Sequence, residues 1–211
     1  MADIKTLTMD IQRYVGVTAD GVYGPNTARA ILTKLQDLEA EPNTEGTSEK
    51  SDAGFPEVFK ATPNVSTSTI RPEGVVLHHS YGSYVGGVEW ILNDASDVSY
   101  HVLIDKDGSR TVFARDTQRA WHAGTSSFNG KRGCNGFMLG LAFSGDTTNR
   151  ELTKAEIDSA VEFLLPRFKR WGWPKNLSTI TTHREVSPDR KVDVDFRAEK
   201  AILKALKKAL I

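Results

Sequence analysis

Hydrophobic residues near the start of the chain recur with helical spacing. Between Ile4 and Val15 they follow one another at intervals of three and four residues, as one face of a helix does. A glycine-rich turn at 20–25 precedes a second helix-like segment at 27–34. Residues 1–36 are therefore expected to form a small all-α module with a thin core.

The next segment, residues 37–55, has almost no large apolar side chains. Between residues 37 and 54 it carries six Asp and Glu residues against one Lys. A segment of this composition cannot bury enough apolar surface to offset the entropy lost on ordering. We therefore expect a flexible acidic linker here.

From about residue 56 strand-like and helix-like patterns alternate. Runs of apolar residues predict buried strands, and the Asp107-Gly108 turn joins two of them. Thr153 and Glu156 form a capping-box pattern ahead of an amphipathic helix that Pro166 is expected to kink. Interleaved elements of this kind predict an α/β domain over 56–211, with a central mixed β-sheet flanked by helices. The predicted strands are 74–79, 98–104, 111–114 and 137–143, and the predicted helices are 85–93, 153–168 and 200–210.

Composition narrows the possible functions. The chain has 27 basic and 27 acidic side chains, and this balance gives no general attraction to nucleic acid. A single cysteine, Cys134, permits no intramolecular disulfide, so folding needs no oxidising compartment. The sequence contains no apolar run typical of a signal peptide or a membrane span, so we expect no stable membrane insertion.

The five histidines all lie within the predicted α/β domain over 56–211 and are candidate metal ligands. A catalytic zinc site uses three protein ligands and keeps a fourth position open for water. His78 and His79 are neighbours in a predicted strand, so their side chains point to opposite faces and only one can enter a given site. His183 and Asp193 bracket a turn that contains Pro188 and can fold back to one point. Taken singly, each of these residues is more often structural than functional.

Five local motifs follow one another along the predicted α/β domain. They are VVLHHS at 75–80, SYHV at 99–102, AWHAG at 120–124, CNGFMLGL at 134–141 and HREVSPDRKVD at 183–193. Together, and in this order, they resemble the zinc amidase family that includes phage amidase endolysins, peptidoglycan recognition proteins and cytosolic muropeptide-recycling amidases. The resemblance extends over roughly residues 70 to 197.

The resemblance implies a zinc site built from His78, His183 and Asp193. The family places Asp or Cys at the third position. Asp195 competes with Asp193 for that role, because the end of the motif is shortened in this chain. The family assigns no role to His79, which is expected to be a core or supporting residue.

The resemblance also implies a catalytic pair, Tyr100 and Lys191, beside the metal, and a substrate groove lined by His122 and Asn135. The reaction would be hydrolysis of the amide between N-acetylmuramic acid and the L-alanine of the stem peptide. Recycling amidases carry a glutamate in the strand after the Cys-Asn segment, and this chain has Ala142 there. This difference favours a mechanism that uses the tyrosine and the lysine.

The N-terminal module contains Ile11-Gln12, DGVYGPNT at 20–27 and Ala30-Ile31. In these residues it resembles the three-helix peptidoglycan-binding domain. Tyr23 would offer a flat face to a sugar or a peptide. The alternative is a small helical cap without a ligand.

These features favour a phage endolysin that acts as a monomer on bacterial peptidoglycan. Such an enzyme would be stored in the host bacterial cytoplasm and would reach the wall through a holin-type pore, since the sequence shows no signal peptide. The alternatives are a cytosolic muropeptide-recycling amidase and a non-catalytic peptidoglycan-binding protein. An intact set of three metal ligands argues against the latter.

Overall fold

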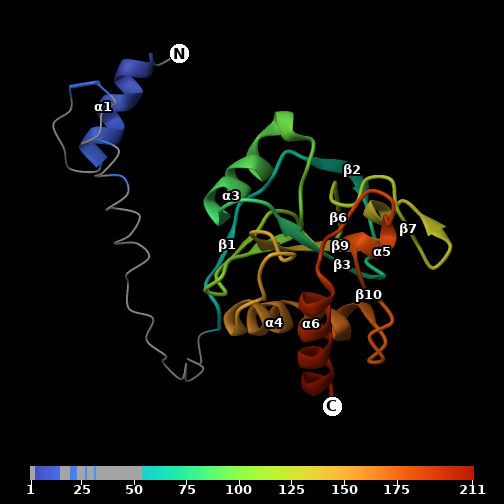
Figure 1. Ribbon diagram of the computed structural model, residues 1–211. Coiled ribbons are helices and arrows are strands. Elements are labelled where there is room, and N and C mark those ends of the chain that lie inside the picture. Colours follow the sequence, from blue (N-terminus) through green and yellow to red (C-terminus); the bar gives the residue numbers. More distant parts are fainter. Residues whose placement is uncertain (1–2, 15–19, 23–26, 28–30, 32–53) are drawn as a thin grey trace. The chain divides into compact units, whose positions relative to one another are not determined.

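A computed structural model describes residues 3–14, 20–22, 27, 31 and 54–211 (Figure 1). The chain divides into two compact units, Met1–Ser51 and Asp52–Ile211. Each unit is described by itself below.

The N-terminal unit contains helix α1 (Ile4–Tyr14), in which Gln12 is buried. The side-chain amide of Gln12 donates to Asp20 Oδ1 at 2.7 Å and to Thr27 Oγ1 at 3.0 Å. Its carbonyl oxygen accepts from the Gly21 amide at 2.9 Å. Residues of the predicted binding motif therefore share one hydrogen-bonded centre.

The predicted apolar face of α1 is exposed in this unit. The exposed fractions of Ile4, Leu7 and Ile11 are 84%, 52% and 43%, whereas Thr8 and Gln12 are buried. Most of the helix expected at 27–34, and Tyr23 with it, lie outside the described residues.

A six-stranded mixed sheet forms the centre of the second unit, with the strand order β1-β5-β4-β9-β3-β10. The β4–β5 pair is antiparallel and runs through the expected Asp107-Gly108 turn, while the remaining neighbours are parallel. The mixed central sheet that the sequence predicts is thus confirmed. Its strands are β1 (Glu57–Phe59), β3 (Gly74–Ser80), β4 (Val102–Ile104), β5 (Arg110–Val112), β9 (Met138–Ser144) and β10 (Ile180–Thr182).

Two small sheets and two short 3-10 helices lie outside the large sheet. None of them was expected from the hydrophobic pattern, because each is only two to five residues long. They are β2 (Val65–Thr69) with β6 (Gln118–Ala120), β7 (Ser127–Phe128) with β8 (Lys131–Arg132), η1 (Asp94–Ser96) and η2 (Cys134–Gly136).

Helices cover both faces of the large sheet. Figure 1 shows α4 (Lys154–Trp171) and α6 (Phe196–Ala209) side by side, and both contribute buried residues to the main core together with β3 and β9. Helix α3 (Tyr84–Leu92) packs through Val88 and Ile91 on Leu103 and Ala142, in a separate core cluster. A short helix, α5 (His183–Val186), follows β10.

The ends of the helices follow from their capping residues. Helix α4 begins at the expected capping box of Thr153 and Glu156 and continues through Pro166 to Trp171. Helix α6 begins at Phe196, earlier than the expected position 200, because the Asp195 side chain accepts a hydrogen bond from the Arg197 amide and caps it.

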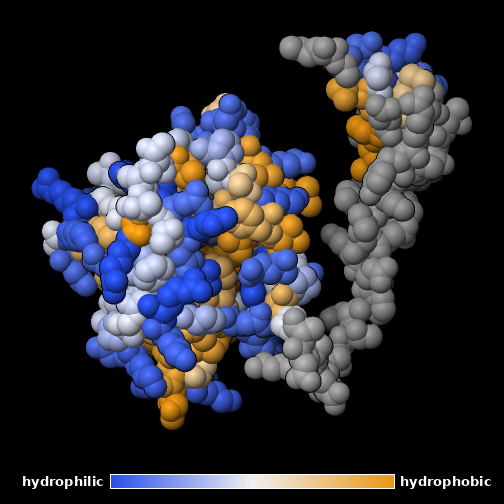
Figure 2. Space-filling model, turned by 180° about the vertical axis from the view of Figure 1, so that it is seen from behind, coloured by the Kyte–Doolittle hydropathy of each residue, from blue (hydrophilic) through white to orange (hydrophobic). Residues whose placement is uncertain are grey.

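The face of the second unit drawn in Figure 2 is largely hydrophilic. Figure 2 shows hydrophobic residues gathered mainly along one side of the second unit. Val58 and Phe59 of β1 and Val85 and Trp90 of α3 are among the exposed apolar residues. Within the described part of the chain, no helix has both the length and the apolarity needed to cross a bilayer.

Candidate metal centre

The site begins at the C-terminal end of strand β3. Val75 and Leu77 point into the core under α4 and α6, so strand alternation turns His78 to the opposite face. The His78 side chain is fully buried there. The strand therefore presents a single histidine to this face, as the sequence predicts.

His183 and Asp193 reach the same point from the end of β10 and from the loop before α6. His183 is the first residue of α5, which the side chain of Thr182 caps in a capping box with Glu185. The Arg184 amide, at the next position, donates to the Asp193 carbonyl oxygen at 2.5 Å. The turn between the two residues thus folds back on itself, as expected from the sequence.

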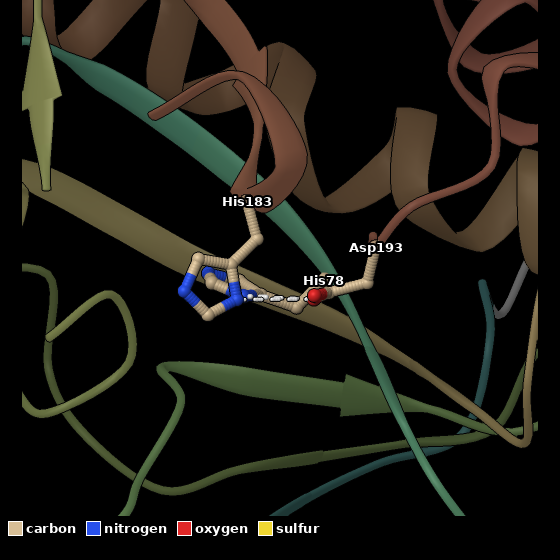
Figure 3. A group of neighbouring side chains, drawn as sticks. All are labelled: His78, His183 and Asp193. Atoms are coloured by element: carbon tan, nitrogen blue, oxygen red, sulfur yellow. Dashed lines mark hydrogen bonds and ion pairs between the residues drawn. The ribbon is translucent and has the colours of Figure 1, made fainter. Parts of the chain in front are cut away.

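Three side-chain atoms converge at this point (Figure 3). Asp193 Oδ2 lies 3.1 Å from His183 Nδ1 and 3.4 Å from His78 Nδ1. Among the described residues, this is the one group of histidine, cysteine and acidic side chains arranged as metal ligands. All three residues are buried.

The electrostatics of the site favour neutral imidazole at His78 and an ionised Asp193. Burial lowers the pKa of His78 to about 4, against the opposing effect of Asp193, and the charges of His183 and Lys191 act in the same direction as burial. Burial raises the pKa of Asp193, but its interactions with the His183 and His78 imidazoles outweigh burial and hold the pKa well below its usual range. Neutral imidazole and carboxylate are the forms that bind metals.

His122 fixes which nitrogen of His78 carries the proton. His122 Nε2 lies 3.1 Å from the Met138 carbonyl oxygen, which can only accept, so this nitrogen bears the hydrogen. Burial holds the pKa of His122 well below its usual value, so its Nδ1 is an acceptor, 2.9 Å from His78 Nε2. His78 Nε2 must then donate, which leaves the lone pair of His78 Nδ1 directed at Asp193 and His183.

A second carbonyl orients His183 in the same way. His183 Nε2 lies 3.3 Å from the Ala123 carbonyl oxygen, to which Arg190 also donates at 3.1 Å. When His183 Nε2 donates to this carbonyl, the Nδ1 atom faces the site as an acceptor. Buried His78 Nδ1 has no hydrogen-bond partner within the described structure. These acceptor atoms surround a point that suits a cation.

The two predicted catalytic residues lie around this cluster. The ring centroid of Tyr100 is 5.1 Å from that of His78. Burial, together with the charge of Asp193, raises the pKa of the Tyr100 phenol, which therefore stays protonated. Lys191 is partly buried, and its amide donates to the Ser187 carbonyl oxygen at 3.0 Å, which closes the turn before Asp193.

The predicted groove residues have contacts within the protein. His122 is only 5% exposed and lies behind His78, so its ring supports this ligand from the interior. Asn135 Oδ1 accepts from the amides of His122 and Ala123 at 3.1 and 2.7 Å. A Cβ atom at Gly140 would lie 2.6 Å from the His122 ring, so only glycine leaves room for that ring. The sequence did not reveal these contacts, because they join segments that are distant along the chain.

The other candidates have different partners. Asp195 caps α6 and pairs with Arg197 at 2.7 Å, so the structure brings Asp193 and not Asp195 to the histidines. Ala142 pairs in register with His78 and packs under α3. The corresponding position on β9 therefore contributes no carboxylate. His79 points to the opposite face of the sheet from His78.

Comparison with known proteins identifies related sequences. The family described as N-acetylmuramoyl-L-alanine amidase matches residues 68–195. The 1,6-anhydro-N-acetylmuramyl-L-alanine amidase AmpD of Haemophilus influenzae is 36% identical over 97 residues, which cover 46% of this chain and 51% of that protein. AmpD of Escherichia coli K12 is 33% identical over 96 residues, with 46% and 51% covered. The match thus spans about half the length of these curated relatives.

Solved structures share the fold. A selenomethionine derivative of AmpD superposes with a TM-score of 0.60 at 25% identity, covering 73% of this chain and 94% of that one. The N-acetylmuramoyl-L-alanine amidase LysC of Clostridium intestinale gives 0.51 at 20% identity, covering 71% and 95%. At 20% identity, the similarity to LysC shows a shared fold alone.

One expectation from the sequence is wrong. A phage enzyme that reaches the wall through a holin-type pore does not fit curated relatives that are AmpD amidases of bacteria such as H. influenzae, Citrobacter freundii and E. coli. The expectation was based on the resemblance of residues 1–36 to a wall-binding domain and on the absence of an apolar run typical of a signal peptide. Neither feature distinguishes a phage enzyme from a bacterial one that works where it is made.

Proposed function

Because the chain belongs to the N-acetylmuramoyl-L-alanine amidase family, we propose that it hydrolyses the amide between N-acetylmuramic acid and the L-alanine of the stem peptide. The substrate that we propose is a soluble muropeptide. Relatives named 1,6-anhydro-N-acetylmuramyl-L-alanine amidase support this choice over the intact wall. The enzyme would then be of the recycling type.

The convergence of His78, His183 and Asp193 carries the proposal. Two imidazole lone pairs and a carboxylate oxygen face one another, and this arrangement calls for a cation. Tetrahedral Zn²⁺ ligands at about 2.0–2.1 Å from the metal lie about 3.3 Å from one another. In the structure, Asp193 Oδ2 lies 3.1 Å from His183 Nδ1 and 3.4 Å from His78 Nδ1, which fits that spacing. We therefore propose Zn²⁺ as the cofactor.

Bound Zn²⁺ would supply a polarised substrate carbonyl and a water molecule whose pKa is lowered to about 7. Tyr100 keeps its proton and can donate a hydrogen bond to the reacting groups next to His78. The Lys191 ammonium can stabilise the negative charge that develops on the carbonyl oxygen. With Ala142 on β9, no carboxylate at that position can accept a proton. We therefore assign the catalytic roles to Tyr100 and Lys191.

We assign two further roles next to the ligands. His122 orients His78 through the bond of 2.9 Å between the rings. Asn135 holds the backbone at His122 and Ala123 through its carbonyl oxygen, so its NH2 group remains as a donor for a substrate. Substrate contact by His122 would require displacement of a ring nitrogen from Met138 or His78.

Hydrolysis of polymeric peptidoglycan is a second candidate. It draws support from the hydrogen-bonded centre around Gln12, which joins Asp20, Gly21 and Thr27 of the predicted wall-binding motif. Under this proposal residues 1–36 bind the wall, with Tyr23 in contact with it, and residues 37–55 are the linker. For either substrate we propose that the protein is monomeric. We also propose that it binds no nucleic acid, since a formal net charge of zero gives no general attraction to that polymer.

Parallel digestions distinguish the two substrates. Metal-free protein and zinc-restored protein would each be given a soluble anhydromuropeptide and purified sacculi, with products identified by mass spectrometry. Free peptides that begin with L-alanine, released only with zinc, are the expected result, with faster release from the soluble substrate. New reducing sugar ends would refute the proposed bond, and absence of products from both substrates would refute the amidase activity. Faster release from sacculi would favour the second candidate.

A further inference from the structure

His79 has a set of contacts that the proposed reaction does not use. It is 3% exposed and lies on the opposite face of β3 from His78. His79 Nδ1 lies 2.9 Å from Thr147 Oγ1 and accepts from the Thr147 amide at 3.1 Å. Because an amide nitrogen only donates, Nδ1 is the unprotonated nitrogen of this ring.

Thr147 also forms a hydrogen bond with the segment that carries Asp193. Its side chain is completely buried, and its hydroxyl oxygen accepts from the Asp195 amide at 3.1 Å. The hydroxyl proton is then available for His79 Nδ1. One threonine side chain thus joins strand β3 to the backbone two residues beyond Asp193.

The short segment 193–195 is held at both ends. The Arg184 amide donates to the Asp193 carbonyl oxygen, which ties the segment to α5 and so to His183. Thr147 ties its other end to β3 and so to His78. Val194, between these two points, is fully buried. The position of Asp193 relative to each histidine is therefore set by a separate link.

We propose that His79 and Thr147 are positioning residues for the metal site, because they hold Asp193 at ligand distance from His78. The two adjacent histidines of β3 then serve one site in two ways. His78 faces the metal, and His79 fixes the loop that supplies the third ligand. This inference rests on the zinc site proposed above.

Zinc affinity of the full-length chain tests the link. Zinc alone would be titrated against a competing chelator, for wild type and for Thr147→Val, which replaces the hydroxyl by a methyl group of similar size. We expect the dissociation constant to rise about tenfold, the lower end of the range for residues that support metal ligands. Thr147→Ser keeps the hydroxyl and should restore wild-type affinity.

Thr148→Val is the matched control. The Thr148 hydroxyl bonds to Asp146 at 2.6 Å, whereas the Asp195 amide bonds to Thr147, so loss of the Thr148 hydroxyl should leave the dissociation constant within twofold of wild type. Unfolding temperatures of the metal-free proteins separate affinity from stability. Equal zinc affinity of folded Thr147→Val and wild type would overturn the proposal while leaving the zinc site intact. Failure of wild type to bind one zinc would overturn both.

A second pair of variants decides the matter if Thr147→Val does not fold. His79→Asn keeps an acceptor oxygen for Thr147, whereas His79→Leu has none. The proposal requires weaker zinc binding in His79→Leu than in His79→Asn. Equal affinities of these two variants would contradict it.

Discussion

The contact between His78 and His122 leads to a prediction about metal affinity. Replacing His122 by phenylalanine keeps a flat ring above Gly140 but removes both ring nitrogens. His78 Nε2 and the Met138 carbonyl oxygen then lose their partners. Without an acceptor for a proton on Nε2, the tautomer of His78 that leaves Nδ1 unprotonated is no longer favoured.

The magnitude follows from the buried groups left unpaired. Each unsatisfied buried donor or acceptor costs about 1–3 kcal/mol, so His122→Phe should lower the free energy of unfolding by about 2–6 kcal/mol. Loss of a partner that orients a metal-bound histidine typically weakens metal binding about 10–100-fold. This loss corresponds to about 1.4–2.7 kcal/mol of binding free energy.

Chelator competition with zinc at neutral pH measures the affinity, and denaturant unfolding of the metal-free protein measures the stability. His101→Phe is the matched control, because the His101 ring likewise makes two hydrogen bonds, with the Gln118 carbonyl oxygen at 2.9 Å and with the Gly140 amide nitrogen at 2.9 Å, and makes none with His78. It should lose a similar amount of stability and keep its zinc affinity. Zinc binding by His122→Phe within twofold of wild type would refute the reasoning.

Three further predictions concern the same site. Asp193→Ala should lower zinc affinity at least 100-fold in a chelator titration, whereas Asp195→Ala should keep the affinity and lose about 1 kcal/mol of stability with its helix cap; the reverse result would make Asp195 the ligand. Tyr100→Phe should lower kcat about 10²–10⁴-fold without changing zinc affinity, as expected for loss of a group that assists proton transfer; an unchanged kcat would exclude Tyr100 from the chemistry. Burial lowers the pKa of both His78 and His101 to about 4 in the folded state, against about 6.5 when unfolded. Between these values the unfolded chain binds the extra protons, so the metal-free protein should lose stability as pH falls from about 6.5 to about 4, and denaturation curves that do not change over this window would contradict the burial argument.

The sequence predicts those parts of the fold whose pattern is local. The apolar runs that form β3 and β9, and the capping box of α4, are readable because burial or capping acts within each segment. Strand β1 has three exposed residues and is a strand only through its pairing with β5. The strand expected at 98–104 is shortened to β4, because the Ser99 side chain and backbone bond to Asn64 and Trp121 instead.

The site was predictable to the extent that its residues fall in recognisable motifs. The turn between His183 and Asp193 could be inferred from Pro188, and the family resemblance supplied the choice of His78. The supporting residues could not be found in this way. His122 meets His78 across 44 residues and Thr147 meets His79 across 68, and such contacts depend on the register of the sheet.

The order of the chain explains why this site needs supporting residues. The three candidate ligands come from strand β3, helix α5 and the loop before α6, and no two of them share an element. A helix that carries two ligands one turn apart fixes their spacing by its own geometry. Here the spacing depends on hydrogen bonds between segments. Two buried residues make these bonds, His122 on one face of the sheet and Thr147 on the other. Substitutions at these positions should therefore affect zinc affinity more strongly than equally buried residues elsewhere in the core.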